Sequence, residues 1–531
     1  MNTQDFDVIV IGSGMGGLAL GSILAQMRKK RVLILERHYR LGGFTHAFDR
    51  PGGRSWDVGL HYVGDMHPGS MSRSLFDFVT AGGVDWARMP SPFEKFVYPD
   101  FTFDVPDDSR ECRQRLVDRF PDERAAIEQY FNDVKAASRW FSMHLMAKSA
   151  PSVVALPVRL FKKASDSLAL GTTREYMEHR FRDPRLRAVL LSQWGDYGLP
   201  PSQSAFVIHA LIVSHYWRGG YYPVGGAETI AQAIQPIIET RGGACLVNHP
   251  VTEILLEGNK AVGVKVRVKH GKEVSEREFR APIVVSNAGA AVTYRDLLPE
   301  SVSALFRAEL DRLASGVGCV TLYIGFKENP SALGFRGENH WIFNDYDHDA
   351  VYAARNELLN GRPAFCYLSF PSLKNPHAKT HTAEIIAPVD YEPFQSWREQ
   401  PWHKRDAAYL DLKARIGDSM LDFVERHYPG FRNLVDYTEL STPLSVEHFT
   451  GHVRGTIYGL TAVPDRFRAS WLGTDTPVRN LFLTGADVTT PGIVGALMGG
   501  VVTAARLTGG ALAWMRIMEA AKAAGKGPSN S

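Results

Sequence analysis

The fold of this chain is constrained most by the 20-residue run VIVIGSGMGGLALGSILAQM, which extends from Val8 to Met27 and precedes the basic residues RKKR. An uncharged run of that length beside basic residues is typical of a helix that spans a bilayer. However, the stretch from Phe6 to Ile11 is short and rich in β-branched residues, which favours a buried parallel strand. Five glycines between Gly12 and Gly21 would also weaken a spanning helix. The pattern therefore predicts a strand, a tight loop and a helix rather than a membrane anchor.

The glycine spacing within this run matches the requirements of a dinucleotide-binding loop. Gly12 permits the tight turn, Gly14 lets the backbone approach a pyrophosphate, and Gly17 allows the helix to lie close to the strand. The N-terminus of the helix offers free N–H donors to the phosphates. A second predicted strand, RVLILE, ends about 20 residues later at Glu36, where a carboxylate can accept hydrogen bonds from a ribose. The sequence therefore predicts a dinucleotide site.

Length and composition place the chain among ordinary globular proteins. At 531 residues it is too long for one hydrophobic core, and its 44% hydrophobic and 22% charged residues are a normal balance. The 60 Lys and Arg residues nearly match the 57 Asp and Glu residues, and no long basic tract contains interleaved aromatics. We therefore expect two or more domains and no nucleic-acid partner.

Cysteine usage and the first residues indicate the compartment. The four cysteines are scattered without a CxxC pair, which predicts neither a disulfide framework nor a zinc site and fits a reducing compartment. The chain begins MNTQDFD, which has two acids and no basic n-region, and no small-residue cleavage site ends the apolar run. We therefore expect a cytoplasmic protein.

Four further stretches resemble one enzyme family. They are RHYRLGGFTHAFDRPGGRSWDVGLHYVG after Glu36, the stretch from Tyr221 to Val264, VVSNAG at 284–289, and NLFLTGADVTTPGIVGALMGG at 480–500. Together they resemble the FAD-dependent phytoene desaturase, carotenoid isomerase and retinol saturase family, within the wider amine-oxidase-like flavoproteins. The stretch from Leu190 to Gly226 is more similar to retinol saturases and carotenoid isomerases than to phytoene desaturases.

The resemblance implies an α/β fold class, in which a discontinuous Rossmann-like FAD-binding domain of the glutathione-reductase-like, amine-oxidase type joins a mixed α+β substrate domain. The FAD domain is expected at 1–75, 221–295 and 470–510, where strand and Gly-turn character recurs. The substrate domain is expected at 76–220 and 296–469, and a C-terminal helix and flexible tail at 511–531.

The FAD-binding residues implied by the motifs come from all three parts of that domain. In the wider family many members place Arg after the Gly pair at 42–43, whereas this chain has Phe44, so we expect no Arg contact there. The strand around Val251 is expected to place backbone against the adenine. The expected set is Gly12, Ser13, Gly14, Met15, Gly16, Gly17, Glu36, Arg37, Gly42, Gly43, Phe44, Thr45, His61, Val251, Asn287, Gly485, Asp487, Gly492, Ile493 and Val494.

The C-terminal motif also makes physical sense without the family. Leu481 to Thr484 predicts a strand, Gly485 and Asp487 form a turn with a carboxylate for ribityl or ribose hydroxyls, and a helix is expected from Pro491. By resemblance, the helix N-terminus near 492–494 faces the pyrimidine edge of the flavin, where its dipole would stabilise negative charge. The alternative is a terminal core helix.

The stretches between the FAD segments predict a helix and a sheet. FPDERAAIEQYFNDVKAASRWF, at 120–141, has apolar residues on one helical face. GCVTLYIGF at 318–326, AFCYLSF at 364–370 and TAEIIAPVD at 382–390 are typical of strands. Residues 57–62, which include Asp57, Gly59, His61 and Tyr62, alternate as a strand does. An aromatic-lined sheet of this kind can form the wall of a lipid tunnel.

The segment from Trp140 to Leu170 combines aromatic, aliphatic and basic residues and is interrupted by Pro151 and Pro157. It is too interrupted to span a bilayer but suits an element in the bilayer interface, with its basic side chains toward anionic lipid. The alternative is a buried helical pair of the substrate domain, and the sequence favours neither. The first hypothesis makes the protein peripheral on the inner face of a membrane.

The expected chemistry is hydride exchange with flavin N5 at a carbon–carbon double bond, while a protein acid exchanges the proton. Only one dinucleotide fingerprint is visible, so we expect an external electron donor or acceptor and no NAD(P)H site. His209 and His215 lack a carboxylate partner at metal-ligand spacing, so no metal site is expected. Six residues are candidate acids, although each type also has structural roles in cores and turns: His61, Tyr62, Asp196, Tyr197, His215 and Tyr458.

The leading hypothesis is an FAD-dependent oxidoreductase that reduces or isomerises double bonds of a long apolar polyene, such as a carotenoid, a retinoid or an unsaturated fatty acyl lipid. One alternative is a desaturase that passes electrons to oxygen or a quinone. Another is a GDP-dissociation-inhibitor-like protein that shares the fold and binds prenylated partners without catalysis. The retained Glu36 and the C-terminal motif count against this last class.

Overall fold

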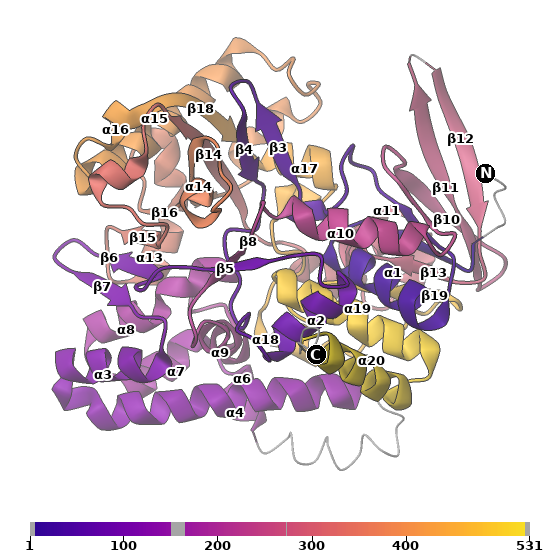
Figure 1. Cartoon of the computed structure of the whole chain (residues 1–531), viewed down its shortest axis with the longest axis horizontal. Coiled ribbons are helices and arrows are strands. Elements are labelled where there is room, and N and C mark those ends of the chain that lie inside the picture. The colour runs from indigo at the N-terminus through magenta and orange to yellow at the C-terminus, as the bar shows by residue number, and fades with distance from the viewer. Residues whose placement is uncertain (1–5, 150–164, 272, 526–531) are drawn as a thin grey trace, which may run out of the picture.

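The computed structural model describes residues 6–149, 165–271 and 273–525. Figure 1 shows a parallel sheet with its helices on one side of the molecule and, on the other, a second sheet above a layer of helices. The N- and C-terminal segments both belong to the side with the parallel sheet, together with part of the middle of the chain.

The parallel sheet is built from strands that are far apart in the sequence. Its strands are β1 (Val8–Ile11), β2 (Val32–Leu35), β9 (Ala244–Leu246), β13 (Val284–Ser286) and β19 (Leu481–Leu483). Their order is β19-β13-β1-β2-β9, and every neighbouring pair is parallel. The strands predicted at 6–11, 31–36 and 481–484 are therefore confirmed. The finer limits of the two domains stay a prediction.

Helices pack closely on this sheet and on one another. The helix α1 (Met15–Arg28) contacts α10 (Glu228–Glu239) and α19 (Ile493–Thr508), while α2 (Met71–Val79) contacts α20 (Ala511–Ala524). A Cβ atom on Gly500 of α19 would lie 2.6 Å from the carbonyl oxygen of Gly16, so the backbones of α19 and α1 touch. The apolar run at 8–27 is thus a strand, loop and helix, as expected. The predicted C-terminal helix is α20, and residues 526–531 of the expected tail lie outside the described residues.

A second, antiparallel sheet of three strands projects from the same side of the molecule (Figure 1). It consists of β10 (Val251–Leu256), β11 (Ala261–His270) and β12 (Glu273–Arg280). Val264 and Val266 of β11 are buried beneath it, whereas most of β12 is exposed. The sheet therefore caps the outer flank of the parallel sheet and places the strand around Val251 there.

The largest sheet has seven strands. They are β6 (Glu94–Val97), β7 (Thr102–Val105), β14 (Gly318–Phe326), β15 (Asn339–Phe343), β16 (Phe365–Ser369), β17 (His381–Val389) and β18 (Val435–Ser441), in the order β18-β14-β17-β16-β15-β6-β7. The three strands predicted in this region are confirmed. Cys366 and Leu368 pack in the cluster that contains α15 (Ala407–His427), whereas Phe365 and Tyr367 face the opposite side. This alternation gives the sheet one aromatic face.

Helices cover that aromatic face. They are α3 (Ser109–Arg119), α4 (Arg124–Ser149), α6 (Asp166–Leu170), α7 (Thr173–Arg180), α8 (Pro184–Leu191) and α9 (Phe206–His215). The predicted amphipathic helix is α4, which buries Ile127, Tyr130 and Val134. Of the segment 140–170, residues 150–164 lie outside the described residues, and Trp140 is fully buried. Among the described residues, no helix combines the length and the apolar character that crossing a bilayer requires.

Short elements connect these layers. They are β3 (Ala47–Arg50), β4 (Arg54–Asp57), β5 (Trp86–Arg88), β8 (Tyr221–Pro223), α11 (Ala290–Asp296), α12 (Arg307–Leu313), α13 (His348–Ala353), α14 (Pro371–Lys374), α16 (Phe431–Leu434), α17 (Pro443–Thr450) and α18 (Pro464–Arg468).

The predicted strand at 57–62 is wrong, because β4 ends at Asp57. The Asp57 carboxylate accepts hydrogen bonds from the backbone N–H of Ala227 (2.9 Å) and from the hydroxyl of Tyr222, so this side chain joins the end of β4 to another segment. A Cβ atom on Gly59 would lie 3.1 Å from Phe44. The chain after Asp57 is therefore shaped by tertiary contacts and not by strand pairing.

Candidate functional site

The loop between β1 and α1 has the geometry of a phosphate-binding turn. Gly12 has a φ of +93°, which a residue with a side chain adopts only with strain. A Cβ atom on Gly43 would lie 2.9 Å from Gly14 Cα, so the Gly pair after β2 packs directly on the loop. The amide of Asn287 donates to the carbonyl oxygens of Gly12 (3.4 Å) and Gly14 (3.3 Å). The loop is thus fixed from two other parts of the chain.

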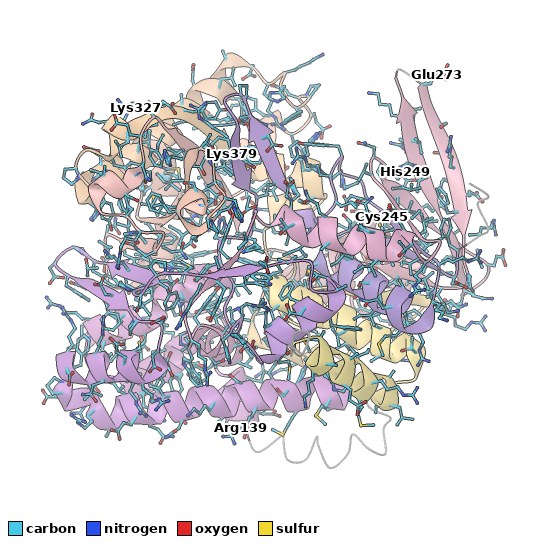
Figure 2. All side chains as sticks on the ribbon, in the orientation of Figure 1. Arg139, Cys245, His249, Glu273, Lys327 and Lys379 are labelled. Carbon is cyan, nitrogen blue, oxygen red and sulfur yellow. The ribbon has the colours of Figure 1, made fainter. Side chains whose placement is uncertain are left out.

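Glu36 lies beside this loop at the end of β2. Its Oε2 accepts hydrogen bonds from the backbone N–H (2.8 Å) and the hydroxyl (2.6 Å) of Ser13, and its Oε1 accepts one from the N–H of His38 (2.8 Å). The N–H of His249, which Figure 2 labels, donates to the Glu36 carbonyl oxygen (2.8 Å). Since His249 is two residues before Val251, the β10 segment approaches the point where a ribose and its base would lie. These contacts fit a dinucleotide.

The C-terminal motif meets the same loop from the other side. The Asp487 carboxylate accepts hydrogen bonds from the backbone N–H groups of Ala290 (2.7 Å) and Leu460 (3.0 Å), so it joins two loops. The buried hydroxyl of Thr484 has no hydrogen-bond partner among the described residues. Gly492, with a φ of +88°, caps the N-terminus of α19, and a Cβ atom there would meet no described atom within 4 Å. An unpaired hydroxyl and open space at a helix N-terminus fit a polar ring system.

These motifs line one cavity with two chemically different walls. One wall consists of residues from the dinucleotide loops, among them Gly14, Phe44, Thr484 and Gly492. The other is apolar and aromatic, and its residues are Trp194, Trp341, Phe365, Tyr367 and Ile386. The second wall belongs to the aromatic face of the seven-stranded sheet and to the segment after α8. The cavity therefore joins the predicted cofactor site to a space for an apolar molecule.

The structure separates the expected residues into two groups. Residues that line the cavity are Gly14, Met15, Gly16, Gly42, Phe44, Thr45, His61, Asp196, Asn287, Tyr458, Asp487, Gly492 and Ile493. Residues outside its lining are Gly12, Ser13, Gly17, Glu36, Arg37, Gly43, Tyr62, Tyr197, His215, Val251, Gly485 and Val494. The roles assigned to both groups stay predictions.

Two of the candidate acids are engaged elsewhere. Nε2 of His215 accepts a hydrogen bond from the N–H of Gly64 (2.8 Å), and burial lowers the pKa of His215 to about 4. The hydroxyl of Tyr197 lies 3.5 Å from Nδ1 of His209, and the Tyr197 side chain is buried. Neither residue lines the cavity, so neither is placed to exchange a proton with a molecule bound there.

His61 belongs to a buried charged cluster at the cavity wall. Its Nδ1 lies 2.7 Å from Oε2 of Glu384, a side chain with no exposed surface. Nζ of Lys374 donates to the carbonyl oxygen of His61 (2.6 Å), to Oδ1 of Asn339 (2.9 Å) and to Oγ of Ser369 (2.6 Å). Burial lowers the pKa of Lys374 to about 7, although the carboxylates of Glu384 and Asp57 oppose this change. The cluster therefore fixes the backbone at His61, while the ring lies close to the Glu384 carboxylate without a hydrogen bond to it.

A second buried cluster lies behind Asp196. The hydroxyl of Tyr62 is 2.7 Å from Oδ2 of Asp196 and 2.6 Å from Oε1 of Glu94. Glu94 also accepts hydrogen bonds from Nε1 of Trp341 (2.8 Å, to Oε1) and Nε2 of Gln193 (2.8 Å, to Oε2). Of these residues, Asp196 and Trp341 line the cavity, whereas Tyr62 and Glu94 are packed behind them.

The sequence reasoning missed Glu94, Lys374 and Glu384. A signal was present for Glu384, because the predicted strand TAEIIAPVD contains an acid among apolar residues that the sheet buries. Glu94 likewise occupies a fully buried strand position. Lys374 ends the four-residue helix α14, and no sequence signal marked it.

A family model described as flavin containing amine oxidoreductase matches residues 15–508. The all-trans-retinol 13,14-reductase of Homo sapiens is 34% identical over 524 residues, covering 94% of this chain and 85% of that protein. Prolycopene isomerase 1 of an Oncidium hybrid cultivar is 26% identical, covering 95% of this chain and 84% of that protein. The solved structure of wild-type putrescine oxidase bound to putrescine superposes with a TM-score of 0.58 at 15% identity, covering 94% of this chain and 98% of that one.

Proposed function

This chain belongs to the flavin-containing amine oxidoreductases and its cofactor is FAD, and from this premise we propose that it reduces or isomerises carbon–carbon double bonds of a long apolar polyene. The retinol 13,14-reductases and prolycopene isomerases among its relatives support a polyene substrate. The observation that carries the proposal is the single cavity in which dinucleotide-loop residues and a wall of aromatic side chains meet. A conjugated chain is an apolar rod that such a wall can hold.

The residues present fit FAD. Gly14 and Gly43 would allow the backbone to approach a pyrophosphate, and Glu36 at the end of β2 would accept hydrogen bonds from a ribose. The unpaired Thr484 hydroxyl and the open N-terminus of α19 would be available to the isoalloxazine. Bound FAD supplies hydride transfer to or from a carbon of the double bond. The chain itself has to orient the polyene, exclude water and move the balancing proton.

Two side chains at the cavity are suited to the proton step. Both line the same cavity: the His61 ring lies within ion-pair distance of Glu384, and the Asp196 carboxyl is hydrogen-bonded to Tyr62. The Tyr458 hydroxyl also lines the cavity, but it donates to the carbonyl oxygen of Gly195 (2.9 Å). His61 and Asp196 are therefore the candidates for the proton donor.

The test is anaerobic incubation of the reduced and the oxidised enzyme with a panel of retinoids, carotenoids and unsaturated fatty acyl lipids, followed by mass analysis. We expect a gain of two hydrogens, or an unchanged mass with altered retention, for at least one polyene. A loss of two hydrogens would identify a desaturase of the same group instead. A colourless protein without an oxidised-flavin spectrum would favour a prenyl-binding protein, and no change in any lipid would contradict the proposal.

We also propose that electrons reach the enzyme from an external donor or leave it to an external acceptor. The support is that the sequence shows one glycine fingerprint for a dinucleotide, and this fingerprint lies in the loop after β1 of the parallel sheet. A carrier protein, oxygen or a membrane quinone would meet this requirement.

A contact with the surface of a membrane through residues 140–170 is a further part of the proposal. Met146 of α4 is exposed, whereas Trp140 and Phe141 are buried, so the contact would lie beyond Phe141. In a flotation assay with vesicles that contain anionic lipid, we expect the full chain to float and a variant without residues 150–164 to stay in solution. Vesicles of neutral lipid are the control. Equal soluble recovery of the two proteins would contradict the contact.

A further inference from the structure

The cluster of Asp196, Tyr62 and Glu94 has too few hydrogen-bond donors to be fully ionised. One hydroxyl lies between two carboxyl oxygens, at 2.7 Å from Asp196 and 2.6 Å from Glu94. A tyrosine hydroxyl has one proton and can donate it to only one of these oxygens. Two carboxylates that share a buried site also repel each other strongly. One of the two carboxyl groups therefore carries a proton.

The neighbours of each carboxyl group show which one holds that proton. The indole N–H of Trp341 is a donor only, and it points at Oε1 of Glu94, while the amide of Gln193 is assigned as a donor to Oε2. Three donors around one carboxyl group favour its ionised form. The Asp196 carboxyl, in contrast, has one hydrogen-bond partner among the described residues, the Tyr62 hydroxyl. The proton therefore belongs on Asp196, which faces the cavity.

The electrostatics agree with this assignment. Burial and the charge of Glu94 raise the pKa of Asp196 well above its usual range, although the hydrogen bond from Tyr62 lowers it. Burial also raises the pKa of Glu94 to about 7. The other titratable groups near Asp196 are the phenols of Tyr197, Tyr216, Tyr367 and Tyr458, which are neutral at pH 7. One lysine, Lys374, lowers the pKa of Glu94 by its positive charge.

We propose that Asp196 is the catalytic acid that exchanges the proton with the polyene, and that Tyr62 and Glu94 are positioning residues that keep this proton available at the cavity. This inference rests on the proposed function and deepens it. In the reducing direction the O–H bond of Asp196 breaks and a C–H bond forms at the carbon next to the one that receives the hydride. The electron pair of the O–H bond stays on Asp196, whose new carboxylate accepts the hydrogen bond of Tyr62. Water restores the proton after each turnover.

Asp196 can serve this role because its surroundings hold it at the wall. Of the three members of the cluster only Asp196 lines the cavity, as do the aromatic residues Trp194, Tyr367 and Tyr458. Glu94 is fully buried behind it and cannot reach a substrate. A polyene in the apolar part of the cavity would therefore meet a neutral carboxylic acid and no buried charge.

The first test is infrared titration of the holoenzyme without substrate, which reads the C=O stretch of a protonated carboxyl. We expect a band at pH 7 that Asp196→Asn removes. The matched control is Asp133→Asn, since Asp133 is also a buried carboxylate with a tyrosine donor but lies outside the cavity; this variant should keep the band. A band unchanged by Asp196→Asn would overturn the proposal.

Two neighbouring variants should shift the titration of Asp196 in opposite directions. When Asp196 is ionised its carboxylate can accept the hydrogen bond of Tyr62, so Tyr62→Phe removes a contact that favours the ionised form and the pKa of Asp196 should rise. Glu94→Gln removes a negative charge that raises it, so the pKa should fall. If the shared proton were not on Asp196, the two variants would not shift the midpoint of the Asp196 band in opposite directions. If one variant fails to fold, the sign of the other still decides the outcome.

The last test uses turnover. With a substrate from the panel, Asp196→Asn should lower the rate by about 100-fold or more, with flavin content and substrate affinity unchanged. In D₂O one deuterium should enter the product carbon that is not attacked by the hydride. An Asp196→Asn enzyme as fast as the unaltered one would overturn the proposal. If no lipid reacts while the infrared band behaves as expected, the proposed substrate class fails and the protonated Asp196 stands.

Discussion

Gly16→Ala is expected to give a protein that retains little FAD and unfolds more readily. In a helix, alanine is normally more favourable than glycine by about 1 kcal/mol. Here the added Cβ would lie 2.4 Å from Gly485 Cα, 2.8 Å from Gly485 N and 2.7 Å from Oδ1 of Asn287. Backbone atoms of a packed loop cannot move aside cheaply, and overpacking of this kind costs about 1–3 kcal/mol or more. The clash therefore outweighs the gain in helix propensity.

The measurement is the flavin-to-protein absorbance ratio together with the thermal midpoint. Gly473→Ala is the matched control, because its Cβ would meet no described atom within 4 Å and its backbone does not require glycine. This control should keep both values. If Gly16→Ala retains its flavin and its midpoint, then the contact between α1 and the 485 loop is not what fixes the cofactor site.

The sequence predicted the parts of the fold that local pattern determines. The strand, glycine loop and helix at the start of the chain, the strand before Gly485 and three of the seven strands of the larger sheet follow from apolar periodicity and glycine placement. Glycines mark these motifs in the sequence, because where two backbones touch there is no room for the Cβ atom that every other residue carries. The loops that line this half of the cavity could therefore be predicted from the sequence, while their contacts with FAD stay a prediction.

The buried charged clusters around Asp196 and His61 could not be predicted from the sequence in the same way. Glu94 and Glu384 come from strands β6 and β17 of one sheet, and Lys374 from α14, so their proximity to Asp196 and His61 exists only in the folded chain. A buried acid inside an apolar strand indicates that a partner must exist but does not identify it. The wrong strand at 57–62 has the same origin, since the bonds that Asp57 accepts from Tyr222 and Ala227 replace strand pairing.

Lys374→Met is expected to destabilise the protein strongly and to disturb the site at His61. The methionine side chain is similar in length but cannot donate hydrogen bonds to the His61 carbonyl oxygen, Asn339 and Ser369. It also removes the positive charge that faces Glu384, which has no exposed surface. Removing one partner of a buried charged cluster typically costs about 3–5 kcal/mol. Chemical denaturation at pH 7 measures this cost, and the exposed Lys404→Met is the matched control.

The loss of unfolding free energy caused by Lys374→Met should also depend on pH, and the burial of Lys374 determines the direction of this dependence. Burial lowers the pKa of Lys374 in the folded protein to about 7, whereas the unfolded chain keeps the ordinary value of 10.5. Between these values the unfolded state holds a proton that the folded state has lost, so the stability of the unaltered protein rises with pH. Lys374→Met lacks this contribution, and the difference in unfolding free energy between the two proteins should therefore widen from pH 7 to pH 10, by on the order of 4 kcal/mol. A difference that narrows over this range would mean that Lys374 stays charged in the folded protein, stabilised by Glu384 and Asp57 more than burial opposes it.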